Sequence, residues 1–515
     1  MALTLGPILL LAGETLWGIC SGAVPLAAIL SSSIRRAGLL WNSVALGAGV
    51  AAGGMALGTL VALAVWRRPS FRLLRWVVLA MAAVPPYVHV LGWNGFARTL
   101  AATARSARLP FVAFGGWGAA WWVQLMATLP FAVVLIVAAL ESLDPALIES
   151  ARTLRPVGYA LRRVVLPMIW PVVAAAGGLL FLLSVTDYSV PSLFQRNVYA
   201  LAVFAEYSAG GDARVAFSMA LPLVAIAAGA AAASQAGLRA IVQKPSWRTP
   251  AWRETSGVSL AWSAAETFGI VILVAQAAVP LLSLIADMAN GTSLVRSVAE
   301  ARAEIALTLG VSATAAVLCL LPAWALARAM ERARPRLRWL LWIALLAPLA
   351  FPAPVVGLGL IGIWNWSPAF RPHGTLIMPV LAALARFLPL AALIVGAHLR
   401  RIDPLLLDAA RVHRTSAAKT MYFVGLPLLL PGILTASFCV FVMTAGELGA
   451  TLMVTPPGYQ TLSVRIYNYL HYGSSSVVAS LCFVLMMLAL AGAAAATAAA
   501  AGWMRLLRGS ESDCV

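Results

Sequence analysis

The chain has 515 residues, of which 62% are hydrophobic and only 10% are charged, and its formal net charge is +18. One water-soluble core cannot bury this much apolar surface, so the composition excludes a soluble globular protein. In a soluble protein, so high a positive charge would suggest binding to nucleic acid. Here most basic residues lie in short loops between apolar stretches, a distribution that is typical of membrane proteins and sets their topology.

Apolar stretches long enough to cross a bilayer recur along nearly the whole chain. A helix needs roughly 20 apolar residues to span about 30 Å of hydrocarbon, and a spanning segment must satisfy its own backbone hydrogen bonds. We therefore predict an all-α polytopic membrane protein with about 12 transmembrane helices. The predicted spans cover approximately residues 5–29, 41–65, 73–94, 114–140, 168–192, 214–237, 262–288, 305–327, 338–363, 374–399, 428–453 and 477–503.

The two sides of the membrane differ in basic residues. If the amino terminus is cytoplasmic, the outer segments carry about half as many arginines and lysines as the inner loops, so we expect both termini inside. The first span contains Glu14, which is costly in lipid, but no cleavable signal is evident and we expect this span to remain. The five cysteines show no CxxC spacing, so we expect neither a disulfide nor a metal site.

The least apolar stretch between spans divides the chain near its midpoint. This stretch, QKPSWRTPAWRETSG, is rich in Pro, Ser and charged residues and reads as a linker. We predict a first repeat of about six helices at 1–240, a cytoplasmic linker at 241–260 and a second such repeat at 261–515. With an even number of spans in each half, the two repeats share one orientation and are parallel.

A polar loop follows the fourth predicted span of each half. The first begins at Asp144 as DPALIESARTLRPVGYALRRVVLPMIWP, and the second begins at Asp403 as DPLLLDAARVHRTSAAKTMYFVGLPLLLPG. Both open with Asp-Pro, continue with an acid and an Ala-Arg pair, and end with Leu-Pro once a one-residue gap is allowed. The match indicates an internal duplication with both loops in the cytoplasm.

An acidic residue lies at the same interval beyond each Leu-Pro. These residues are Asp187 and Glu447, near the far ends of the following spans, where an ionisable group is costly. We predict that they face protein or a wet cavity, with Tyr188, Gly446 and Gly449 beside them, and that they mark the transport path or its outer gate. Glycines around Glu447 favour a helix break there. The alternative is a pair of solvated acids in outer loops.

The two polar loops resemble the EAA motif of permease subunits of binding-protein-dependent ABC importers. In that family the loop forms a coupling helix that docks on a cytoplasmic ATPase, and the resemblance implies a type I importer permease fold and the same role here. The residues that would form the ATPase-coupling loops are Glu149, Ser150, Ala151, Arg152, Arg155, Leu166, Pro167, Asp408, Ala409, Ala410, Arg411, Arg414, Leu426 and Pro427. Arg155 and Arg414 replace the glycine of the family motif, so a different turn is expected.

No residue pattern indicates that this chain hydrolyses ATP or acts as an enzyme. It has no GxxxxGK[ST], HExxH or GxSxG sequence, so we expect no catalytic residue and no cofactor on the chain, with ATP and Mg on a partner subunit. The resemblance implies two copies of an ABC ATPase, a periplasmic or lipoprotein substrate-binding protein, and a place in the bacterial inner membrane. We expect contact with lipid and none with nucleic acid.

The substrate follows only from the resemblance. Two permease halves in one polypeptide are similar to the ferric-iron, thiamine and aminophosphonate importers, and the segment from Glu447 to Gly473 looks most like the ferric-iron type. We therefore expect ferric iron, with thiamine, aminophosphonate or polyamine as alternatives. The rivals from other classes are an ion-coupled secondary transporter, which the paired loops disfavour, and a non-transporting scaffold, which predicts no duplication.

Overall fold

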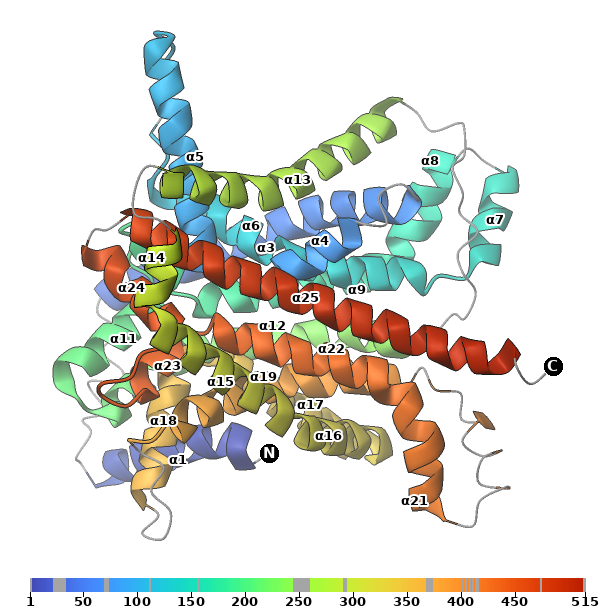
Figure 1. Ribbon diagram of the computed structural model, residues 1–515. Coiled ribbons are helices and arrows are strands. Elements are labelled where there is room, and N and C mark those ends of the chain that lie inside the picture. The colour runs from blue at the N-terminus through green and yellow to red at the C-terminus, as the bar shows by residue number, and fades with distance from the viewer. Residues whose placement is uncertain are drawn as a thin grey trace.

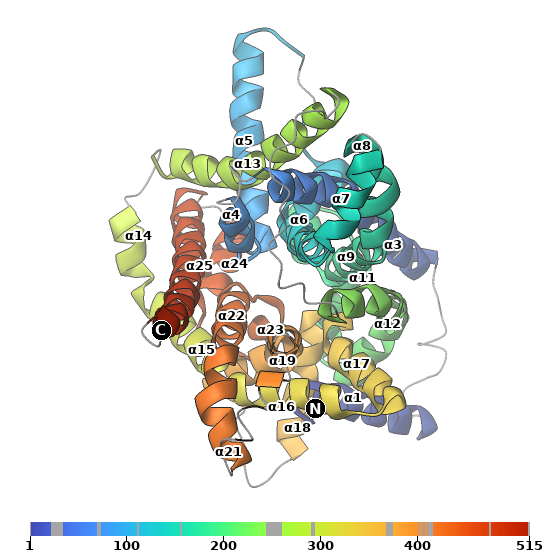
Figure 2. The same cartoon turned by 90° about the vertical axis from the view of Figure 1, so that its right-hand side faces the viewer.

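The computed structural model describes residues 2–21, 34–68, 74–110, 113–154, 157–243, 260–289, 294–366, 374–400, 402, 405–406, 409, 412, 416–472 and 475–512. Over these ranges the secondary structure is helical, with no strand. Most of the long helices run side by side in one bundle, while α5 and α18 run across it (Figures 1 and 2).

The first half holds the helices up to residue 243. They are α1 (Ala2–Cys20), α3 (Ile34–Arg67), α4 (Leu74–Met81), α5 (Pro86–Ser106), α6 (Gly116–Glu141), α7 (Pro145–Leu154), α8 (Val157–Ala160), the π-helix η2 (Leu161–Val165), α9 (Leu166–Thr186), α10 (Ser189–Leu193), α11 (Tyr199–Gly210) and α12 (Ala213–Gln243).

The second half repeats this order. Its helices are α13 (Leu260–Ala289), α14 (Leu294–Glu300), α15 (Arg302–Leu318), α16 (Leu320–Arg332), α17 (Pro335–Ala350), α18 (Ala353–Trp366), α19 (Ile377–Leu399), α21 (Ala417–Thr420), the π-helix η3 (Met421–Gly425), α22 (Leu426–Ala445), α23 (Gly449–Val454), α24 (Leu462–Tyr472) and α25 (Ser475–Ser512).

A π-helix precedes the Leu-Pro pair in both halves. Proline has no N–H, and its ring crowds the carbonyl one turn earlier, so an ordinary α-turn is disfavoured just before Pro167 or Pro427. In the wider turn, the backbone N–H of Leu166 donates to the carbonyl of Leu161. The same bond joins Leu426 to Met421. The two halves therefore share this local distortion as well as the Leu-Pro pair.

Nine helices in the described ranges are long and apolar enough to cross a membrane, or up to ten if the bent pair formed by α17 and α18 counts as one span. Two further predicted stretches differ from straight spans. The predicted span 73–94 is split into α4 and α5 before Pro86, and α1 is a shorter apolar helix. The bend between α17 and α18 is 105° and lies at Pro352. Proline accounts for both breaks, because it removes an N–H donor from the helix.

Each half sends its first helix across to the other half. α1 packs against α18, and α13 packs against α5. A side chain at Gly359 would collide with Pro7 of α1, and one at Gly92 would collide with Pro280 of α13, so glycine permits both crossings. The first helix of each half therefore packs against the other half. Residues 244–259 of the predicted linker lie outside the described residues.

A buried ion pair holds α13 on the first half. Glu266 near the start of α13 accepts hydrogen bonds from Arg67 and, at 3.2 Å, from Nε of Arg68, both at the end of α3. The side chain of Glu266 is only 4% exposed, so it depends on these arginines for compensation of its charge.

Candidate functional site

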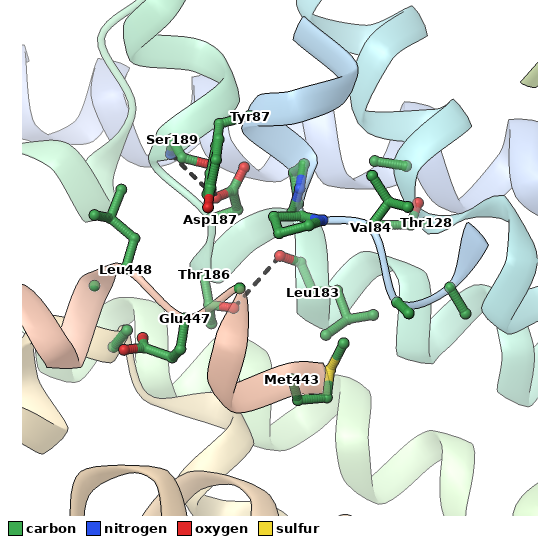
Figure 3. A pocket seen from close by; sticks show the side chains of 18 of the residues that line it. Val84, Tyr87, Thr128, Leu183, Thr186, Asp187, Ser189, Met443, Glu447 and Leu448 are labelled. Carbon is green, nitrogen blue, oxygen red and sulfur yellow. Dashed lines mark hydrogen bonds between the residues drawn. The ribbon is translucent and has the colours of Figure 1, made fainter. Parts of the chain in front are cut away.

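The two acidic residues lie at equivalent turns. Asp187 follows the last residue of α9 and precedes α10, and Glu447 follows the end of α22 and precedes α23. The helix breaks predicted at these positions are thus present. Figure 3 shows Asp187 and Glu447 among the side chains that line one pocket, with Leu183 of α9 and Met443 of α22 beside them.

Asp187 is held by the start of the helix that follows it. Its Oδ1 accepts hydrogen bonds from the backbone N–H of Ser189 at 3.0 Å and from the Ser189 hydroxyl at 2.7 Å. Its Oδ2 accepts from the N–H of Val190 at 3.3 Å and from Nε2 of Gln124 on α6 at 3.1 Å. A carboxylate in this position satisfies N–H groups that a helix start leaves unpaired.

Glu447 caps α23 in the same way but also forms an ion pair with an arginine. Its two oxygens accept from the backbone N–H groups of Ala450 at 2.9 Å and Thr451 at 2.8 Å, and from the Thr451 hydroxyl at 2.6 Å. Nη1 of Arg386 on α19 donates to Oε1 at 2.6 Å. Because the Glu447 side chain is 4% exposed and that of Arg386 is 19% exposed, the pair is largely desolvated.

The turns face a cavity of about 190 Å³ between the halves. Its walls come from the α4–α5 break, α6, the α9–α10 turn, α18, α19 and the α22–α23 turn. All five residues predicted for the path line it, namely Asp187, Tyr188, Gly446, Glu447 and Gly449. The structure thus brings together residues that lie about half a chain apart in sequence, while their role in transport remains a prediction.

The two glycines let the second turn pack tightly against the first half and against α18. A side chain at Gly446 would collide with Pro85 at the α4–α5 break. An added Cβ at Gly449 would lie 2.6 Å from that of Ala353 at the start of α18. The wall of the cavity is therefore continuous across the boundary between the halves.

Two buried polar atoms of residues that line the cavity have no hydrogen-bond partner among the described residues. They are the hydroxyl of Tyr188 and Nε of Arg386. The Tyr188 ring is 4% exposed and stacks on Phe204 with ring centres 5.5 Å apart. Both groups can donate a hydrogen bond.

Sequence reasoning missed Arg386 and Gln124. Both lie on helices that were predicted as spans, and an ionisable or amide side chain inside an apolar stretch signals an interior or functional position. That signal was available for Arg386, which interrupts the stretch 374–399. The pairing with Glu447 was not available, because the two residues lie on different helices.

The first predicted coupling loop forms α7, which lies off the bundle at the end where α21 and the C-terminus also lie (Figure 1). Asp144 caps it by accepting the N–H of Ala146 at 3.0 Å. Glu149 and Ser150 are exposed and Ala151 is half-buried. Leu166 and Pro167 begin α9. Arg152 belongs to α7, but its side chain and all of Arg155 lie outside the described residues.

The second predicted coupling loop is described only in part. Ala409 is helical and exposed, and Leu426 and Pro427 begin α22 as their counterparts begin α9. The remaining predicted coupling residues lie outside the described residues, namely Asp408, Ala410, Arg411 and Arg414.

No family model matches the chain. It is 31% identical over 181 residues to a permease protein assigned to 2-aminoethylphosphonate transport in Salmonella typhimurium, covering 35% of this chain and 67% of that protein. It is 23% identical over 480 residues to an Fe(3+)-transport system permease protein of Haemophilus influenzae, covering 88% of both. A molybdenum transport system permease protein of Azotobacter vinelandii is 28% identical over 180 residues, which cover 32% of this chain and 80% of that protein.

Proposed function

The chain belongs to the permease subunits of ABC-type transport systems, and on that premise we propose that it forms the whole translocation path of a bacterial importer from two fused halves. The observation that carries the proposal is the cavity between the halves, which is lined by matching acidic turns from both. The relative from Haemophilus influenzae supports the fused form, because the likeness extends over 88% of each chain.

As a permease subunit the chain is a multi-pass inner-membrane transport protein and not an enzyme, and its function implies an ATPase subunit and a substrate-binding protein. We propose two ATPase copies, one for each half, with both termini cytoplasmic. The end of the bundle that carries α7, α21 and the C-terminus would then face the ATPases (Figure 1).

The coupling loops would transmit the motion of the ATPases to the path. α7 packs against α8 and η2, and α8, η2 and α9 follow one another without a break up to Asp187 in the cavity wall. A displacement of α7 would therefore reach the acidic turn through this continuous helical run. The second half has the same connection from η3 through α22 to Glu447.

Ferric iron is our proposed substrate. The support is the relative that matches nearly the whole chain, which is named for Fe(3+) transport. An external binding protein would deliver the iron, and the cavity would give it passage without serving as a resident metal site.

An oxyanion is the second candidate, because Arg386 and Tyr188 are among the residues that line the cavity. Guanidinium and hydroxyl groups recognise phosphonate and molybdate oxygens. The relatives named for 2-aminoethylphosphonate and molybdenum transport favour the same class.

Co-purification from native membranes followed by an ATPase assay tests both parts of the proposal. We expect an ATPase and a binding protein to accompany the chain, and hydrolysis to rise when the binding protein is loaded with ferric iron. Stimulation by 2-aminoethylphosphonate or molybdate instead would select the second candidate. Purification without any ATPase would contradict the proposed function.

A further inference from the structure

The outer part of α5 extends beyond the helix bundle. Up to Gly95, α5 packs on α13, where a side chain at Gly95 would collide with Ser283. From Phe96 onward its large apolar residues are exposed, with Phe96 at 42% and Leu100 at 47%. Figures 1 and 2 both show this part projecting sideways from the bundle, perpendicular to most of the long helices.

This projecting segment, residues 96–106, has two distinct faces. Residues spaced three or four apart share one face of a helix. One face carries Phe96 and Leu100 together with Thr103 and small apolar residues, namely Ala97, Ala101, Ala104 and, just beyond the helix, Ala107. The opposite face carries Arg98, Thr99, Ala102, Arg105 and Ser106.

Aromatic side chains mark the depth of the segment in the membrane. The ring of Trp93 lies 6.1 Å from that of Phe96 and 5.4 Å from that of Trp122, each edge-on. Trp122 lies in the second turn of α6, next to Trp121. Trp93 is buried, whereas Trp121 and Trp122 are only partly buried. Tryptophans gather where a spanning helix meets the headgroup region, so the projecting segment begins near the level of this end of α6. It lies toward the end of the bundle opposite α7 (Figure 1).

The charge of the segment is positive. It carries Arg98 and Arg105, with Arg108 just beyond its end, and α5 contains no acid. Arg98 is anchored to Asp287 of α13 by a 2.9 Å ion pair, which fixes the base of the segment. Arg105 and Arg108 are exposed. An amphipathic helix with arginines on its polar face fits an anionic lipid surface.

On the proposed orientation, with α7 in the cytoplasm, we propose that residues 96–106 lie flat on the outer leaflet, with the Phe96 face in the acyl boundary and Arg105 and Arg108 among anionic headgroups. The segment projects away from the bundle axis, where lipid surrounds the protein, and not over the path, where a binding protein would dock (Figure 2). It would anchor α5, whose first residues line the cavity wall, against movement across the membrane.

Spin-label accessibility in the full chain tests this placement. In a variant without native cysteines, single cysteines replace Phe96, Leu100 or Ala104 on one face and Thr99, Ala102 or Ser106 on the other. The proteins are placed in vesicles of phosphatidylglycerol and phosphatidylethanolamine. We expect labels on the first face to collide mainly with oxygen, and labels on the second face to collide mainly with a water-soluble nickel chelate.

Two results would overturn the proposal. Preferential access of nickel to all six labels would place the segment in water, and protection of the Phe96 face from both reagents would show a protein partner there. The combined substitutions R105S and R108S should lower the oxygen preference in these vesicles but not in pure phosphatidylcholine, and an equal effect in both would exclude recognition of anionic lipid.

Discussion

The acidic turns of the two halves share their backbone and differ in how their charge is balanced. Both carboxylates cap the short helix that follows them. Glu447 is paired with Arg386, whereas Asp187 receives the amide of Gln124, and among the described residues no arginine or lysine forms an ion pair with it. The two turns therefore share the acid that caps the following helix but differ in the group that is paired with it.

This difference makes the cavity asymmetric. The second-half wall contains a neutralised pair, and the first-half wall contains a carboxylate stabilised only by dipoles. Buried ion pairs contribute little net stability but are costly to break on one side. We therefore expect the second turn to be rigid and sensitive to substitution, and the first turn to tolerate loss of charge.

The largest effect is expected from Arg386→Met. It leaves the buried carboxylate of Glu447 without a counter-ion, and breaking such a pair costs about 3–5 kcal/mol. In detergent, the midpoint temperature of thermal unfolding should fall strongly for R386M. The double variant R386M/E447Q should recover part of this loss. The matched change Q124M in the first half should lower the free energy of unfolding by less than R386M does. An R386M protein as stable as the parent would show that the pair is not desolvated.

Gly449→Ser exchanges the glycine for the residue at the equivalent first-half position, Ser189. Its side chain would meet Ala353, and such overpacking costs about 1–3 kcal/mol. The reverse change S189G removes one hydrogen bond to Asp187, a loss of about 1 kcal/mol. Denaturant unfolding should give G449S a lower free energy of unfolding than S189G, and the opposite order would show that a side chain at Gly449 is accommodated without overpacking.

Asp187→Asn separates the role of charge from the role of the cap. Asparagine can still accept the N–H of Ser189, so the free energy of unfolding should change by only about 1 kcal/mol. Uptake should nevertheless fall severalfold, because the uncompensated charge faces the proposed path. Normal uptake by D187N would restrict Asp187 to a structural role.

The smallest effect on stability is expected in the coupling loops. The combined change E149K and R152E alters an exposed helix, and surface changes usually stay within about 0.5 kcal/mol. Uptake should nevertheless fall in proteoliposomes that contain the ATPase, because hydrolysis is no longer coupled to transport. The equivalent change D408K and R411E should act alike, and T153S serves as a control. Full uptake by both variants would remove these loops from the coupling.

Much of the fold was predictable because membrane spans and duplications leave strong local signals. The span predicted at 114–140 is α6, Gly116–Glu141, and the span predicted at 374–399 contains α19, Ile377–Leu399. The exchange of α1 and α13 between the halves was not predictable, since it depends on contacts such as Gly92 with Pro280 far apart in sequence. Hydropathy also extends across proline breaks, so α4 and α5 appeared as one span.

The candidate site was predictable in its acids but not in their partners. Asp187 and Glu447 stood out because charges are costly in apolar stretches and because both follow a Leu-Pro pair at one interval. The hydrogen bonds from Gln124 and Arg386 come from other helices, so no spacing in the sequence encodes them.

Transport by the purified chain in proteoliposomes tests the central claim most directly. The vesicles would contain the chain with or without its ATPase, with loaded binding protein on the outside and ATP inside. Uptake should require both the ATPase and hydrolysable ATP, and should stop with a non-hydrolysable analogue. Accumulation driven by an ion gradient in vesicles that lack the ATPase would contradict the account and identify a secondary transporter.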